Sequence, residues 1–95
     1  MPMMEKTIEQ SLVRKTKEKS GLALKFVSPG MSGVPDRLIL FPLAHIGFVE
    51  LKAPGQKMRP LQLRRKAQLE RLGFRVYCID RIDQIEEVLD EIRSS

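Results

Sequence analysis

Two short apolar runs near the middle of the chain, residues 36–41 and 46–52, limit the possible folds more than any other feature. Both runs carry apolar side chains at odd and even positions alike: Leu38, Ile39, Leu40, Phe41, Phe48, Val49 and Leu51. Because successive side chains of a strand point to opposite faces, strands built from these runs are apolar on both faces. Such strands lie in the middle of a sheet that is covered on both sides. We therefore expect a central hairpin with helices on each face of its sheet.

The rest of the chain supplies those helices. Thr7 opens a segment of capping-box form, Gly21 can end the helix that follows, and residues 1–6 are expected to be disordered. Near the C-terminus, apolar residues recur at helical spacing: Ile82, Ile85, Val88, Leu89 and Ile92. The expected elements are a helix from Thr7 to before Gly21, strands at 22–27, 36–41 and 46–52, a helix at 61–72 stopped by Gly73, a strand at 74–79 and a closing helix. The prediction is one α/β domain, residues 1–95, in the order α-β-β-β-α-β-α.

The charge of the chain favours a partner rich in phosphates. Its 95 residues carry a formal charge of +5. Residues 52–75 hold eight Lys or Arg against Glu70 alone, whereas residues 80–93 hold six acids against two Arg. This separation is typical of a protein that presents one face to DNA. A chain this short also buries a modest core, so a second copy is an expected partner.

Cysteine content and hydropathy exclude several classes. Cys78 is the single cysteine, which excludes an internal disulfide and a Cys-rich zinc site and fits a reducing compartment. No segment of the sequence approaches a membrane span or the apolar core of a signal peptide. The expected location is the cytoplasm, with no membrane partner.

Asp36 and the triplet Glu50-Leu51-Lys52 carry the residue types needed to cut a phosphodiester. Glu50 and Lys52 lie two positions apart on a strand and share a face. Asp36 shares that face only if the hairpin brackets an odd number of residues, so that its register places Asp36 opposite Glu50 or Lys52. An even number of bracketed residues would place Asp36 opposite Leu51, which points to the other face. In the favourable register, cross-strand Cβ atoms lie about 5 Å apart, close enough for two carboxylates to bridge one cation.

Hard carboxylate oxygens favour Mg²⁺ or Mn²⁺ as that cation. The ion would polarise a phosphate and acidify a bound water, while Lys52 orients the water or stabilises developing charge. The plainer alternative is that Asp36 caps a turn and pairs with Arg37 or Lys52, with Glu50 at a solvent-facing strand end.

Two polar residues on the predicted helices point toward the same strand ends. Glu9 falls between Leu12 and Val13 on the less polar face of the first helix, so it is either a third acid at the metal site or a first-turn residue favoured by the helix dipole. Gln62 projects near Leu69 on the inner face of the second helix. It would hydrogen-bond the phosphate or the attacking water, or else be satisfied by backbone at the rim.

The loops at 28–35 and 53–60 are expected to contact the DNA backbone. Their glycines allow close approach of a phosphate, and basic side chains there and on the next helix would add contacts that do not depend on sequence. The candidate DNA-binding residues are Ser32, Gly33, Lys57, Arg59, Arg64, Arg65 and Lys66. Aromatic residues are few, which argues against a stacking surface for single strands and favours duplex or branched DNA.

Taken together, these motifs resemble the virus-type replication-repair nuclease domain, VRR-NUC, of the PD-(D/E)xK superfamily. The resemblance runs from about Glu9 to about Leu89 and is carried by three segments: Ser32-Gly33-Val34-Pro35-Asp36, Glu50-Leu51-Lys52-Ala53-Pro54-Gly55, and Gln62 on a helix ending at Gly73. It implies a restriction-endonuclease-like core with a mixed sheet. It also implies metal binding by Asp36, Glu50 and the Leu51 carbonyl, a catalytic Lys52, and roles for Glu9 and Gln62.

The chain lacks the SAP, helical or helicase regions of the large repair members, and so is similar to stand-alone phage proteins and to Holliday junction resolvases. That likeness implies a homodimer that cuts a four-way junction in DNA replication, recombination or repair. A monomer that cuts flaps or forks, and a DNA-binding module without catalysis, are the alternatives. A restriction-type enzyme is disfavoured because no insertion is available to reach base edges.

Overall fold

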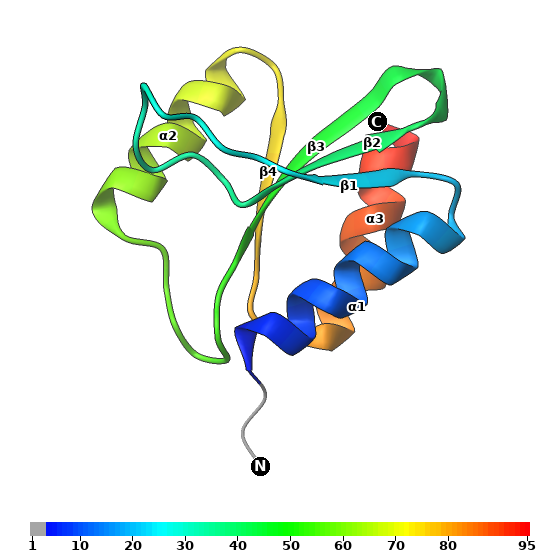
Figure 1. Ribbon diagram of the computed structural model, residues 1–95. Helices are drawn as coiled ribbons and strands as arrows, with labels where there is room; N and C mark the ends of the chain where they lie inside the picture. Colours follow the sequence, from blue (N-terminus) through cyan, green and yellow to red (C-terminus); the bar gives the residue numbers. More distant parts are fainter. Residues whose placement is uncertain (1–3) are drawn as a thin grey trace.

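The computed structural model describes residues 4–95 as seven main elements (Figure 1). They are α1 (Glu5–Glu18), β1 (Leu22–Lys25), β2 (Arg37–Phe41), β3 (His45–Leu51), α2 (Pro60–Arg71), β4 (Arg75–Ile79) and α3 (Ile85–Ser94). Short 3-10 turns at Pro42–Ala44 and Ile82–Gln84 link β2 to β3 and β4 to α3. The predicted order α-β-β-β-α-β-α is confirmed.

The strands form one mixed sheet in the order β1-β2-β3-β4. β1 with β2 and β2 with β3 pair antiparallel, whereas β3 and β4 pair parallel. The two central strands are those predicted from their apolar runs. Helices α1 and α3 lie together on one face of the sheet and α2 lies on the other (Figure 1), so the prediction of helices on both faces is also confirmed.

The hydrophobic core lies between the sheet and the α1/α3 pair. Ile39 and Val49 of the central strands are fully buried there, against Leu12 of α1 and Ile85 of α3. Burial of this apolar surface, at about 25 cal/mol per Å², is the main source of stability for a chain of this size.

The first helix begins earlier than predicted. Its N-cap is Met4, without a side-chain cap, and the Thr7 N–H donates to the Met4 carbonyl at 3.0 Å. Thr7 therefore lies inside the first turn and cannot cap it. The prediction of a disordered start is wrong for residues 4–6, and residues 1–3 lie outside the described part of the chain.

Gly21 ends the helix for a different reason than predicted. The left-handed residue is Ser20, with φ 66°, and the Gly21 N–H donates to the Thr16 carbonyl at 2.9 Å. A Cβ at Gly21 would lie 2.5 Å from the Phe41 ring. The glycine is needed because β2 approaches the backbone closely. Gly73, in contrast, has φ 98° after α2, as a helix stop requires.

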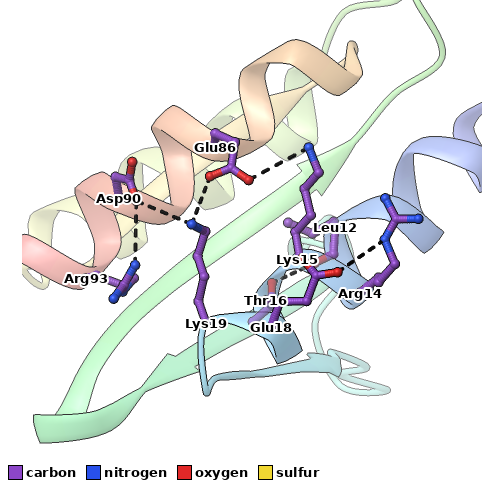
Figure 2. Close-up of polar contacts among 9 residues, drawn as sticks. All are labelled: Leu12, Arg14, Lys15, Thr16, Glu18, Lys19, Glu86, Asp90 and Arg93. Carbon is purple, nitrogen blue, oxygen red and sulfur yellow. Dashed lines mark hydrogen bonds and ion pairs between the residues drawn. The ribbon is translucent and has the colours of Figure 1, made fainter.

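Ion pairs connect α1 to α3 on the surface of the molecule. Lys19 lies 2.8 Å from Glu86 and 3.8 Å from Asp90, and Lys15 lies 3.9 Å from Glu86 (Figure 2). The Lys19 ammonium lowers the pKa of the Glu86 carboxyl below its usual range. The acids of the C-terminal segment thus neutralise lysines of α1, and exposed pairs of this kind add little stability.

No helix within residues 4–95 has the length and apolar character needed to cross a membrane.

A substitution at Gly47 would show how closely α3 packs on the sheet. A Cβ at this position would lie 2.5 Å from Cδ1 and 2.6 Å from Cγ1 of Ile92, which is fully buried. We expect Gly47→Ala to lower the free energy of unfolding by about 1–3 kcal/mol, because Ile92 has no room to move. Urea titration would measure this change.

Gly30→Ala is the matched control, since a Cβ there meets no atom within 4 Å. Adding Ile92→Val to Gly47→Ala should recover part of the loss. A Gly47→Ala protein as stable as the control would contradict the close packing.

Candidate active site

The register of β2 and β3 brings Asp36 and Glu50 together. Arg37 pairs with Val49 and Phe41 with His45, so the same register extended by one residue places Asp36 opposite Glu50. In this register Asp36 and Glu50 point to the same face of the sheet, which is the condition that a shared site requires. The strand β2 itself begins one residue after Asp36, at Arg37.

Asp36 is held by backbone contacts on both sides. Its Oδ2 accepts a hydrogen bond from the Leu51 N–H at 2.8 Å, and its carbonyl accepts one from the Phe26 N–H at 2.9 Å. The alternative in which Asp36 pairs with Arg37 or Lys52 is not observed, since neither ion pair occurs within the described residues. The carboxylate is therefore fixed against the start of the Glu50-Leu51-Lys52 segment.

Glu50 is buried without a partner. Its side chain is 1% exposed, and neither carboxyl oxygen has a hydrogen-bond partner. Burial raises the pKa of Glu50 to about 8, the close approach of the Asp36 carboxyl, through hydrogen bonding and charge, adds to the rise, and Lys52 opposes it. A buried acid of this kind is costly unless a positive charge joins it.

Lys52 lies on the same face as Glu50 and is 8% exposed. Its backbone N–H donates to the Ile79 carbonyl at 2.9 Å, which continues the pairing of β3 with β4 beyond Leu51. Within residues 4–95 no carboxylate lies close enough to form an ion pair with its ammonium. Buried lysines without a paired acid are unusual, and this one stands beside an unpartnered carboxyl.

The structure does not bring Glu9 to this group. Its Oε2 lies 2.9 Å from Nε of Arg37, whose Nη1 also donates to the Ala23 carbonyl at 3.0 Å. Arg37 alternates with Leu38 and stands on the α1/α3 side of the sheet with Ile39, opposite to Glu50. Glu9 therefore has a structural partner, and its predicted role as a metal ligand finds no support in the geometry.

Glu5, one turn earlier on α1, is exposed, and its charge is the least of the causes that raise the pKa of Glu50. Its position was assigned to a disordered start.

Gln62 is engaged at the start of α2. Its Oε1 accepts a hydrogen bond from the Arg59 N–H at 2.9 Å, so the side chain satisfies backbone at the helix terminus. This is the plainer of the two predicted roles. Gln62 is half-buried, and its amide nitrogen forms no hydrogen bond within the described residues, so it can still donate one.

The predicted DNA-binding residues fall into two groups. Lys57, Arg59 and Arg64 are exposed, and none forms an ion pair within the described chain. The others contact neighbouring residues of the chain itself. Arg65 donates to the Ser32 carbonyl at 2.7 Å, Lys66 pairs with Glu70 at 3.0 Å, and Gly33, with φ 82°, packs against Leu61 and Arg65.

Cys78 was not predicted to be near the site. It lies opposite Glu50 in the pairing of β3 with β4, and burial together with Glu50 raises the pKa of its thiol. Parallel pairing of the predicted strands 46–52 and 74–79 could have indicated that Cys78 lies beside Glu50. Its chemistry is that of a half-buried thiol kept protonated.

The donor set fits a hard divalent ion. No group of three or more His, Cys, Asp or Glu side chains in residues 4–95 could hold a metal by itself. Asp36 and Glu50 supply two carboxylates, and the Leu51 carbonyl points to the Asp36 side because N–H and C=O of a strand residue face the same neighbour. Mg²⁺ commonly uses one or two carboxylates and keeps several waters. The orphaned oxygens of Glu50 are what such an ion would satisfy.

Comparisons with known proteins bear on the fold and the family of the chain. A solved structure described as a VRR_NUC domain superposes with a TM-score of 0.84 and 28% sequence identity, covering 90% of this chain and 94% of that one. A protein of Acyrthosiphon pisum secondary endosymbiont phage 1, "Putative nuclease p44", is 51% identical over 79 residues, which span 83% of this chain and 85% of that protein. No family model matches the chain. The fold and the relative nevertheless agree with the resemblance drawn from the motifs, and the chain belongs to the VRR-NUC family of nucleases.

Proposed function

We propose that the protein is an Mg²⁺- or Mn²⁺-dependent endonuclease that hydrolyses phosphodiester bonds in duplex or branched DNA. The observation that carries this proposal is the buried, unpartnered Glu50 carboxyl, with Asp36 opposite and Lys52 on the same face. A cation would turn this costly arrangement into a stable one, which explains why the fold retains it.

Each residue of the group has a chemical role in the proposal. Asp36, Glu50 and the Leu51 carbonyl would hold the ion, which supplies Lewis acidity and a water of lowered pKa when it is bound. Lys52 holds a positive charge beside the scissile phosphate and stabilises the charge that develops there. Gln62 can donate from its free amide nitrogen to a phosphate oxygen. Glu9 is engaged by Arg37, and the charge of Glu5 acts only weakly on Glu50.

DNA is the proposed substrate. The chain carries a net charge of +5, and the exposed cations Lys57, Arg59 and Arg64 lie on the segment that follows the site. Contacts of this type to phosphates give binding that does not depend on sequence. The phage relative named "Putative nuclease p44" supports nuclease action. The proposal places that action on phage or bacterial DNA in the cytoplasm, during replication, recombination or repair.

The proposed working unit is a homodimer similar to a Holliday junction resolvase. A single site cuts one strand, whereas two sites related by a twofold axis would cut a four-way junction symmetrically.

Removal of either charge of the site should abolish cleavage without abolishing binding. We expect Asp36→Ala and Lys52→Ala to reduce cleavage of a four-way junction in Mg²⁺ or Mn²⁺ by roughly 100-fold or more, because each removes charge stabilisation in the transition state. Gel-based cleavage and fluorescence anisotropy with the same DNA would measure the two effects. Lys17→Ala, on the exposed surface of α1, is the control. Equal cleavage by all three variants would refute the site.

The raised pKa of Glu50 predicts how the metal-free protein responds to pH. The folded protein holds a proton on Glu50 up to about pH 8, whereas the unfolded chain loses it near the ordinary value of 4.5. The folded state therefore binds more protons in this window, and stability falls as the pH rises through it. We expect Glu50→Gln to raise Tm at pH 8 by about 5 °C or more, with little gain at pH 5.

Thermal unfolding followed by circular dichroism in EDTA at both pH values would measure this difference. Adding Mg²⁺ or Mn²⁺ should stabilise the wild type and leave Glu50→Gln unchanged. A Tm difference that is the same at pH 5 and pH 8 would contradict the buried acid.

A further inference from the structure

A hollow lies between α2 and the segment that joins β1 to β2, which Figure 1 draws along the side of α2. It has a volume of about 430 Å³, within the range of about 300–1,000 Å³ that ligand pockets span. Most of the atoms that line it are apolar, from Phe26, Met31 and Val34 on the segment and from Leu69 and Leu72 on α2. Two of these side chains are open to solvent, Met31 at 46% exposed and Leu72 at 74%. An apolar hollow left open in this way suits a ligand with apolar faces.

The hollow adjoins the candidate active site. The Phe26 N–H donates to the Asp36 carbonyl at 2.9 Å, so the pairing of β1 with β2 continues to these two residues. Side chains of residues paired across strands point to the same face, with Cβ atoms about 5 Å apart. Val34 also lines the hollow, and its Cα lies at most about 7 Å from that of Asp36 along the chain. A group that fills the hollow therefore lies next to a phosphate held at Asp36 and Glu50.

Contacts within the chain hold the walls of the hollow in place. Arg65 of α2 donates from Nε to the Ser32 carbonyl at 2.7 Å and from Nη1 to Oε1 of Gln68 at 3.0 Å. A Cβ at Gly33 would lie 2.8 Å from Cγ of Leu61, so the segment and the helix approach each other closely there. A pocket that is formed before its ligand arrives loses little entropy on binding.

The side chains of the hollow match the parts of a nucleobase. The ring of Phe26 and the apolar chain of Met31 offer surfaces against which a planar ring can stack. Gln68 also lines the hollow, and its amide nitrogen forms no hydrogen bond within the described residues, so it can donate one to the polar edge of a base. Arg65 and Arg71 border the hollow as well, and neither forms an ion pair within residues 4–95. Their charges complement the phosphates on either side of a base, whereas a purely apolar ligand has no group to pair with them.

We propose that this hollow receives one unstacked nucleobase of the DNA strand whose phosphate is bound at Asp36 and Glu50. The inference rests on the proposed function and names its substrate class, which is DNA with an unpaired base beside the scissile phosphate. Such bases occur at branch points and bulges, where a base leaves the stack at the lowest cost. One pocket holds one base, which agrees with the small number of aromatic residues in the chain.

Binding without cleavage tests the pocket directly. The probes are a forked duplex and a set of otherwise identical forks, each lacking one base at or next to the branch point. In EDTA, fluorescence anisotropy should give the wild type about 10-fold weaker binding to one of the abasic forks than to the intact fork, because the stacking of one base is lost. Equal affinity for every fork would overturn the inference.

Substitutions at the two exposed walls connect that difference to the hollow. Met31→Glu and Leu72→Glu, tested one at a time, place a charge where the base would lie, so each variant should bind the intact and the abasic fork with equal affinity. Leu43→Glu is the matched control, because it adds the same charge at a side chain that is 90% exposed in the turn between β2 and β3. It should keep the full difference between the forks. A difference that survives both wall substitutions would refute the pocket.

Cleavage of the forks in Mg²⁺ or Mn²⁺ separates the two proposals. A protein that distinguishes the forks in EDTA but cuts none of them would refute the proposed function alone. A protein that cuts forks yet binds intact and abasic DNA equally would refute the pocket alone. A wild-type dimer that Leu72→Glu separates, with equal affinity for every fork, would show that a second copy fills the hollow and would also overturn the inference.

Discussion

The pairing of β2 with β3 is the contact on which the core and the site both depend. With Arg37 opposite Val49, the apolar residues Ile39 and Val49 point into the α1/α3 core. The same alternation sends Glu50 and Lys52 to the other face. A slip by one residue would place the Glu50 carboxyl among the core side chains and expose Val49. The hydrophobic core therefore enforces the geometry of the site, although it lies on the opposite side of the sheet.

The fold carries a local cost at the end of β3. Glu50 is buried beside Asp36 with no donor for its oxygens, and its pKa is raised to about 8 as a result. Nothing in the surrounding structure requires an acid at this position for packing. The full burial of Ile39 and Val49 on the reverse face supplies the stability that tolerates it. Sites where local stability is given up in this way are commonly functional ones.

Several errors made from the sequence share one origin, which is that helix ends depend on neighbours. Thr7 has the right residue type for a cap, but α1 extends back to Glu5. Glu9 is paired with Arg37 of β2, a partner 28 residues away. Gly21 was explained by backbone freedom, whereas its close neighbour is the Phe41 ring. In each case a contact distant in sequence decided between roles that were locally equivalent.

The sequence by itself determined the order of elements, the two central strands, and the Asp36 and Glu50-Leu51-Lys52 motifs, because alternation and residue chemistry are local properties. Only the tertiary structure decided the register that joins Asp36 to Glu50, the burial of that carboxyl, and the partners of Glu9 and Gln62. It also decided which half of the sheet stays uncovered, because β1 to β3 are apolar on both faces and the short α2 packs mainly over β4. Coverage depends on where a helix docks in space, and no pattern within a single strand records it.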